Sequence, residues 1–198
     1  MPDLPLPSAP NARADARTHS LCTLAGHVVT AGKEVTAAVA GESAAYRRGE
    51  ERPLGAFIGL MAAYAVAAAG GGVLVRRRGI PDGVGFGDLA LVSVATHKVS
   101  RLLAKDPVTS PLRAPFTRFA GTSGEAELAE EVRGTGARKA VGELVTCPFC
   151  LGQWVATGLV LGLAVAPRAT RLVASVFTAL TVADFLHLAY TAAEQRAT

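Results

Sequence analysis

The chain has 198 residues, of which half are hydrophobic and 18% are charged, whereas an ordinary soluble domain is about 25% charged. The hydrophobic surplus is mostly Ala, Val, Leu and Gly, a mixture typical of membrane helices. The net charge of +4 is modest, and the basic residues flank apolar runs without interleaved aromatic residues. This pattern argues against a nucleic-acid partner and favours a lipid bilayer. Three cysteines are too few for a disulfide framework.

The first fifty residues contain no long apolar run. Residues 1–18 are rich in Pro, Ala and Arg without periodicity, which predicts a disordered tail and no cleavable signal peptide. In residues 19–50, apolar side chains recur mainly at intervals of three, four and seven residues. That spacing predicts a weakly amphipathic helix, either on a membrane surface or in an ordinary soluble setting.

The segment 54–75 is the clearest transmembrane candidate. Its 22 residues carry no charge, and as a helix they would extend roughly 33 Å, enough to cross the hydrocarbon. Arginines flank it on both sides, at positions 47, 48 and 52 and at positions 76–78. We predict the first transmembrane helix here.

The segment 86–104 is equivocal. Asp88, Lys98 and Arg101 lie in it, and a charge at the bilayer centre costs about 2.5–3.5 kcal/mol against about 0.3–0.6 returned by each Leu or Val. The segment can span only if Asp88 lies near one interface and the two basic residues snorkel to the other. The sequence therefore predicts three or four transmembrane helices.

The remaining chain divides into a polar segment and two apolar ones. Residues 105–146 are polar, and three prolines in their first part exclude a continuous helix. We expect a loop here, with a short helix around 125–132. Segments 149–166 and 171–191 are predicted to be helices three and four, joined by a tight turn at 167–171.

The distribution of basic residues predicts the orientation. Among residues 47–198, and whether or not segment 86–104 spans, twelve basic residues lie on the side of the central loop and five on the other. The positive-inside rule then places the loop in the cytosol and the chain in the inner (plasma) membrane.

Cys147-Pro-Phe-Cys150 precedes the third helix and allows three interpretations. A helix start lowers a thiol pKa, as in glutaredoxin-like redox pairs, but no strand or second thiol pair accompanies this one. A zinc site needs two further ligands, for which His97 and His187 are candidates at the same membrane level. Packing at a helix end requires no chemistry, with Pro148 in the first turn. We expect no cofactor, with zinc as the alternative.

Other polar residues are candidates for binding. Asp106 and Arg113, with Arg118, are suited to an anionic head group or a partner, or form a solvated surface. Asp184 lies in an apolar run, where a carboxylate is a candidate functional group. It could instead cap a kink or pair with His97, His187 or Arg101. The candidate cluster comprises Cys147, Cys150, His97, Arg101, Asp106, Arg113, Asp184 and His187.

A motif series in residues 84–192 resembles an uncharacterised bacterial and phage integral-membrane family, domain of unknown function 1360. The motifs are His97-x₃-Arg101-x₄-Asp106, Thr109-Ser-Pro-Leu-Arg113-x₂-Phe116 and Glu143-Leu-x₂-Cys147-Pro-Phe-Cys150-x-Gly152-x-Trp154. The resemblance implies a compact helical membrane domain with a polar cytosolic loop, and it implies no activity.

These observations predict an all-α integral membrane protein with three or four transmembrane helices and a polar central loop. We expect an interaction or structural component of the membrane, with the bilayer and other membrane proteins or a second copy as partners. The alternative is a membrane-embedded thiol-redox or metal-binding enzyme that uses Cys147 and Cys150.

Overall fold

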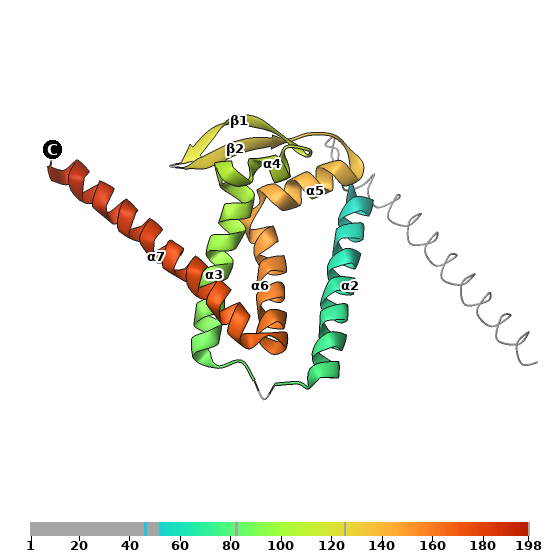
Figure 1. Ribbon diagram of the computed structural model, residues 1–198. Helices are drawn as coiled ribbons and strands as arrows, with labels where there is room; N and C mark the ends of the chain where they lie inside the picture. Colours follow the sequence, from blue (N-terminus) through green and yellow to red (C-terminus); the bar gives the residue numbers. More distant parts are fainter. Residues whose placement is uncertain (1–45, 47–51, 82, 125, 198) are drawn as a thin grey trace, which may run out of the picture. The chain divides into compact units, whose positions relative to one another are not determined.

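The computed structural model describes Tyr46 and residues 52–81, 83–124 and 126–197 (Figure 1). The predicted tail 1–18 lies outside the described residues, as does the predicted helix 19–50 apart from Tyr46. Apart from the first two residues of α2, the features below belong to the unit Ala56–Thr198. Its elements are α2 (Leu54–Arg78), α3 (Phe86–Lys105), the 3₁₀ helix η1 (Pro107–Thr109), α4 (Ser110–Arg113), β1 (Thr117–Gly124), β2 (Glu127–Val132), α5 (Gly136–Thr146), α6 (Pro148–Val165) and α7 (Pro167–Ala197).

Helix α2 covers the first predicted transmembrane segment and continues through the three arginines to Arg78. It runs in the same direction as α6 (Figure 1), which it contacts through Tyr64. The Tyr64 ring packs edge-on against Trp154, with ring centroids 5.2 Å apart, and its hydroxyl lies 2.7 Å from Thr157 Oγ1. No residue of this helix is buried. Much of its apolar surface is therefore not covered by the rest of the described chain.

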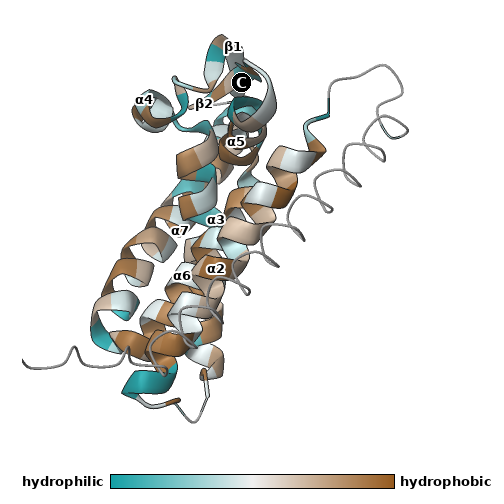
Figure 2. Cartoon of the chain, turned by 90° about the vertical axis from the view of Figure 1, so that its right-hand side faces the viewer, coloured by the Kyte–Doolittle hydropathy of each residue, from teal (hydrophilic) through white to brown (hydrophobic). Residues whose placement is uncertain are grey.

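Helix α3 is the central helix, packed against both α6 and α7 (Figures 1 and 2). Its buried residues are Val92, Ala95, Ser100 and Ala104, small side chains that let the neighbouring helices approach closely. Because it carries several charges, it is not among the three described helices that are long and apolar enough to span a membrane, which are α2, α6 and α7.

Helices α6 and α7 form an antiparallel hairpin, but the predicted turn at 167–171 is wrong. Only Ala166 separates the two helices, and Pro167 begins α7. Proline fits there because the first N–H groups of a helix have no intrahelical acceptor. A Cβ on Gly162 would lie 2.8 Å from Thr170 Oγ1, so glycine permits this close turn. Gly158, by contrast, has nothing within 4 Å.

The segment Asp106–Thr146, here called the cap, is structured rather than a loop. The predicted helix around 125–132 is wrong, because Glu127–Val132 is strand β2, paired antiparallel with β1 from Thr117↔Val132 to Gly124↔Glu127. Glu, Leu and Ala favour helices, but cross-strand pairing overrides that weak preference. The expectation of an all-α fold is therefore corrected: the described chain is mostly helical with a small two-stranded sheet.

Helix α5 packs against β2 and α4 within the cap, and the sequence analysis did not predict this helix. Ala140 and Gly142 are its buried residues. A Cβ on Gly142 would lie 3.1 Å from the carbonyl oxygen of Phe116, so the helix contacts the backbone that precedes β1. The prolines do exclude a continuous helix before β1, as predicted: the chain forms η1 and α4 instead.

Candidate functional site

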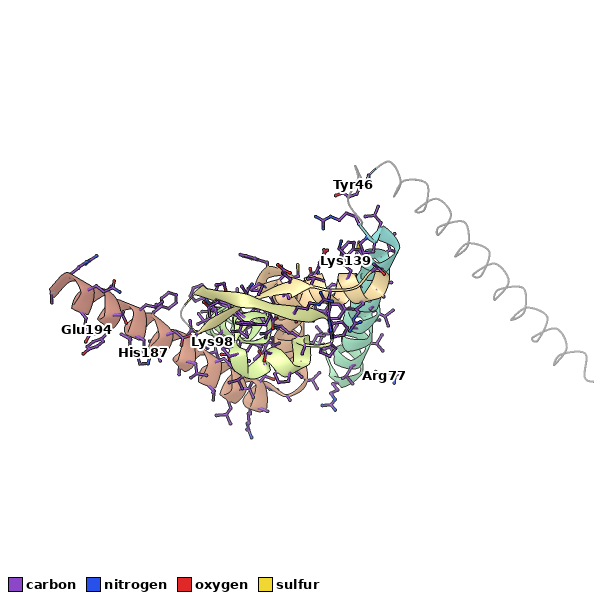
Figure 3. All side chains as sticks on the ribbon, turned by 90° about the horizontal axis from the view of Figure 1, so that it is seen from above. Tyr46, Arg77, Lys98, Lys139, His187 and Glu194 are labelled. Carbon is purple, nitrogen blue, oxygen red and sulfur yellow. The ribbon has the colours of Figure 1, made fainter. Side chains whose placement is uncertain are left out.

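A cavity of about 490 Å³ lies between α3, the tip of the β-hairpin and α7; we call it the α3–α7 pocket. Small-molecule sites have volumes of roughly 300–1,000 Å³. Figure 3 labels Lys98 on α3 and His187 on α7. The lining residues are His97, Lys98, Arg101, Leu102, Lys105, Asp106, Ala126, Glu127, Thr181, Asp184, Phe185, His187 and Leu188.

The pocket contains five of the eight residues proposed from the sequence: His97, Arg101, Asp106, Asp184 and His187. On α3 the polar lining follows helical spacing, since residues 97, 101 and 105 are four apart and share a face. On α7, residues 181, 184, 185 and 188 share a face for the same reason. Two helical faces and a hairpin tip therefore bring together residues that are distant in sequence.

Two ion pairs cross the pocket. Lys98 Nζ donates to Asp184 Oδ2 at 2.5 Å, and Arg101 Nη2 donates to Glu127 Oε1. The side chains of Lys98 and Asp184 are 19% and 49% exposed, and those of Arg101 and Glu127 are 45% and 24% exposed. The sequence reading offered His97, His187 or Arg101 as partners of Asp184, and the actual partner is Lys98. Both pairs remain accessible to solvent.

The two imidazoles have a different environment from these charged groups. His97 and His187 both line the pocket. In the part of the chain that the structure describes, neither ring makes a hydrogen bond or an ion pair with another side chain. Both histidines therefore line the pocket without belonging to its ion pairs.

Arg113 forms a separate, buried network in the cap. Its side chain is 1% exposed and makes a bidentate pair with Glu130, which is 6% exposed, at 2.5 and 3.3 Å. Its other N–H groups donate to the carbonyl oxygens of Leu103 and Asp106 and to Thr109 Oγ1, at 2.7–3.0 Å. All five guanidinium N–H groups thus have acceptors. Arg113 fastens the cap to the end of α3 and has no donor left for a ligand.

The proposed combination of Asp106 with Arg113 and Arg118 does not form one surface. The Asp106 carboxylate accepts a hydrogen bond of 2.8 Å from the Val108 N–H and so caps η1. Arg113 is buried, whereas Arg118 is exposed on β1. Of the three residues, only Asp106 reaches the α3–α7 pocket.

The two cysteines lie at the start of α6, as the sequence indicated. Cys147 is the N-cap residue, and its Sγ accepts a hydrogen bond from the Cys150 N–H at 3.3 Å. Cys150 is exposed, and neither cysteine lines the pocket. Among the described residues, no three His, Cys, Asp or Glu side chains lie close enough to hold a metal ion. The structure thus does not assemble the four ligands Cys147, Cys150, His97 and His187.

Several residues of the site were missed from the sequence. Lys105 continues the four-residue spacing of His97 and Arg101, which was a readable signal. Glu127 and Glu130 gave no such signal, because their segment was interpreted as helix and is a strand. A strand of unassigned register does not reveal which carboxylates face which helix.

Comparison with known proteins supports the resemblance seen in the motifs. The family described as "Protein of unknown function (DUF1360)" matches residues 91–190. The chain is also 36% identical over 86 residues to the sporulation protein YjcA of Bacillus subtilis (strain 168), which covers 42% of this chain and 73% of that protein. No solved structure matches the chain. This chain therefore belongs to the DUF1360 family of proteins of unknown function.

Proposed function

We propose that this chain is a multi-pass integral membrane protein of the inner membrane that acts as an interaction or structural component. The observation that carries the proposal is that few residues are buried on α2, α6 and α7, the three described helices with the length and composition of membrane spans. Figure 2 shows hydrophobic residues along these helices.

The described residues contain too small an apolar core for a water-soluble fold. The buried hydrophobic residues among them are Val92, Ala95, Ala104, Ala140, Leu163 and Ala174. On α7 alone, nine large hydrophobic side chains are more than 40% exposed: Leu172, Val173, Val176, Leu180, Val182, Phe185, Leu186, Leu188 and Tyr190. Each large apolar side chain left in water forgoes about 1.5–3 kcal/mol. Lipid removes that cost.

We further propose that α3 crosses the bilayer inside the bundle, shielded by α6 and α7. Three of its four charged residues form ion pairs: Asp88, in the first turn, accepts two hydrogen bonds of 2.7 Å from Arg171, Lys98 pairs with Asp184, and Arg101 pairs with Glu127. Pairing lowers the cost of placing these charges in or near hydrocarbon. The two charged levels lie toward opposite ends of α3, which fits the requirement derived from the sequence.

With four crossing helices, the cap is proposed to lie in the cytosol. Of the basic residues in 47–198, twelve then lie on the side of the cap and five on the opposite side. Helix α7 has 31 residues, and at 1.5 Å per residue it extends about 46 Å, longer than the hydrocarbon. Its polar last turns would emerge on the cap side.

The proposed role as a component rather than an enzyme draws on the family and its relative. The family carries no described activity, and the YjcA relative is named for a process, sporulation, and not for a reaction. No observation favours a thiol-redox or metal enzyme. Metal analysis of the purified protein and of a Cys147→Ser, Cys150→Ser variant separates the two classes: we expect no stoichiometric metal, and a bound metal lost in the variant would favour the enzyme.

Fractionation of cells that express the untagged chain tests membrane insertion. We expect the protein in the membrane pellet after alkaline carbonate extraction, and its release by detergent. Recovery of monodisperse protein in the supernatant without detergent would overturn the proposal.

A further inference from the structure

We propose that the α3–α7 pocket binds the headgroup of a zwitterionic phospholipid that carries a phosphate and a primary ammonium. This inference rests on the proposed membrane insertion, and it assigns a ligand to the α3–α7 pocket. It combines three observations: a charge-balanced lining, ion pairs that a ligand can replace, and an apolar wall beside the charged groups.

The charge balance selects a ligand without net charge. Three basic residues of α3 line the pocket, Lys98, Arg101 and Lys105. Among the described residues, three carboxylates oppose them, from Asp106, Glu127 and Asp184. In a partly desolvated site an anionic headgroup would leave one uncompensated negative charge. A headgroup that carries one charge of each sign leaves none.

The two ion pairs that cross the pocket are exchangeable. All four side chains are between 19% and 49% exposed, and pairs of this kind contribute little to stability. A phosphate can therefore pair with Lys98 or Arg101, while an ammonium pairs with Asp184 or Glu127. Each ion pair that the ligand breaks is replaced by one that it forms. Lys105 has no ion-pair partner among the described residues, which makes it the first candidate for the phosphate.

The ammonium side of the pocket selects among zwitterionic lipids. A primary ammonium has three N–H donors, and the carboxylates of Asp184 and Glu127 are acceptors. A trimethylammonium group carries the same charge but has no N–H to donate. The pocket should therefore prefer phosphatidylethanolamine to phosphatidylcholine.

The apolar wall and the level of the pocket favour a lipid over a free headgroup. Leu102 of α3 and Phe185 and Leu188 of α7 line the pocket beside the charged groups. Phe185 and Leu188 are 62% and 53% exposed, so they can contact the glycerol backbone and the acyl chains. The pocket also includes the end of α3 and the hairpin tip, where the membrane helices meet the cap and headgroups would lie.

The test is lipid retention by the full chain. Protein extracted from vesicles of phosphatidylethanolamine, phosphatidylcholine and phosphatidylglycerol in equal amounts is analysed by native mass spectrometry. We expect phosphatidylethanolamine to be retained preferentially. Replacing Lys105 by Gln should lower this enrichment about tenfold, as expected for the loss of one charge-assisted hydrogen bond.

A second variant keeps the test independent of folding. Asp184→Asn gives the lining a net positive charge, so retention should shift from phosphatidylethanolamine toward phosphatidylglycerol, a gain that misfolding would not produce. Arg168→Gln, at an exposed residue outside the pocket, is the matched control and should leave the preference unchanged.

Three results would overturn the lipid assignment. They are equal retention of the three lipids by protein that has inserted, equal retention by wild type and both pocket variants, or equally tight binding of soluble glycerophosphoethanolamine. Failure of the chain to insert into vesicles would instead refute the proposed membrane function, so the two failures are distinguishable.

Discussion

The apolar helices and the cap bury opposite kinds of side chain. On α2 and α7 many large apolar side chains are exposed, and few residues of α2, α6 or α7 are buried. In the cap the largest fully buried side chain is the charged Arg113. Two causes explain the difference. Lipid accommodates helices with exposed apolar side chains. The cap is a short polar segment that cannot build a large apolar core, so a fully hydrogen-bonded ion-pair network holds it together.

The largest effect is expected from breaking that network. Replacing Arg113 by Met leaves Glu130 buried without a partner, which should destabilise the cap by about 3–5 kcal/mol. Hydrogen exchange should accelerate at the amides of β1, β2 and α5, while those of α3 and α6 remain protected. This result would show that the buried ion pair stabilises the cap and not the apolar helices.

Two further variants serve as controls for Arg113. Arg118→Met removes an exposed arginine from β1 and should leave exchange unchanged. The double variant Arg113→Met, Glu130→Leu removes both charges and should recover most of the lost protection. Equal, small effects of Arg113→Met and Arg118→Met would show that the cap does not depend on the buried pair.

A smaller effect is expected from crowding the α6–α7 hairpin. In Gly162→Ala the new methyl group would meet Thr170, which should cost about 1–3 kcal/mol and lower the thermal midpoint in detergent. Gly158→Ala, one turn away on the same helix, meets nothing within 4 Å and should not lower it. Equal shifts of the thermal midpoint in both variants would show that the contact with Thr170 does not explain the effect of Gly162→Ala.

The smallest effect is expected at the opposite end of α3 from the cap. The Asp88 and Arg171 side chains are 21% and 51% exposed, so Asp88→Asn should lower the thermal midpoint less than Gly162→Ala does. The charge-reversed pair Asp88→Arg, Arg171→Asp should restore it. A loss as large as that of Arg113→Met would show that exposed and buried pairs do not differ here as proposed.

The sequence predicted the ranges of the long apolar helices well, because length and the absence of charge can both be read from the sequence. Helix α6 begins at Pro148, one residue from the predicted start, and α2 begins at Leu54 as predicted. The turn before α7 was misplaced because a proline that breaks a helix interior is also favoured in a first turn, as at Pro167. The cap was misread because local preferences at Glu127–Val132 favour helix, and only pairing with β1 makes them a strand.

For the candidate site, the sequence indicated how far along each helix the residues lie, but not which face of the helix they occupy. His97, Asp184 and His187 were expected at one end of the bundle, and they line one pocket there. The cysteines were expected beside them, but they belong to the first turn of α6 and do not line that pocket. Which face of a helix meets which neighbour depends on tertiary packing, which the spacing of residues within one segment does not encode.

The most direct test of the central claim, that lipid surrounds the long helices and the cap lies in the cytosol, is cysteine labelling in intact bacterial cells. In a background with Cys22, Cys147 and Cys150 replaced by Ser, single cysteines replace Ile80, Ala120 and Ala169, each exposed in the structure. An impermeant maleimide should label positions 80 and 169 from outside and position 120 only after lysis. Labelling of position 120 from outside, or equal accessibility of all three positions only after lysis, would contradict the account.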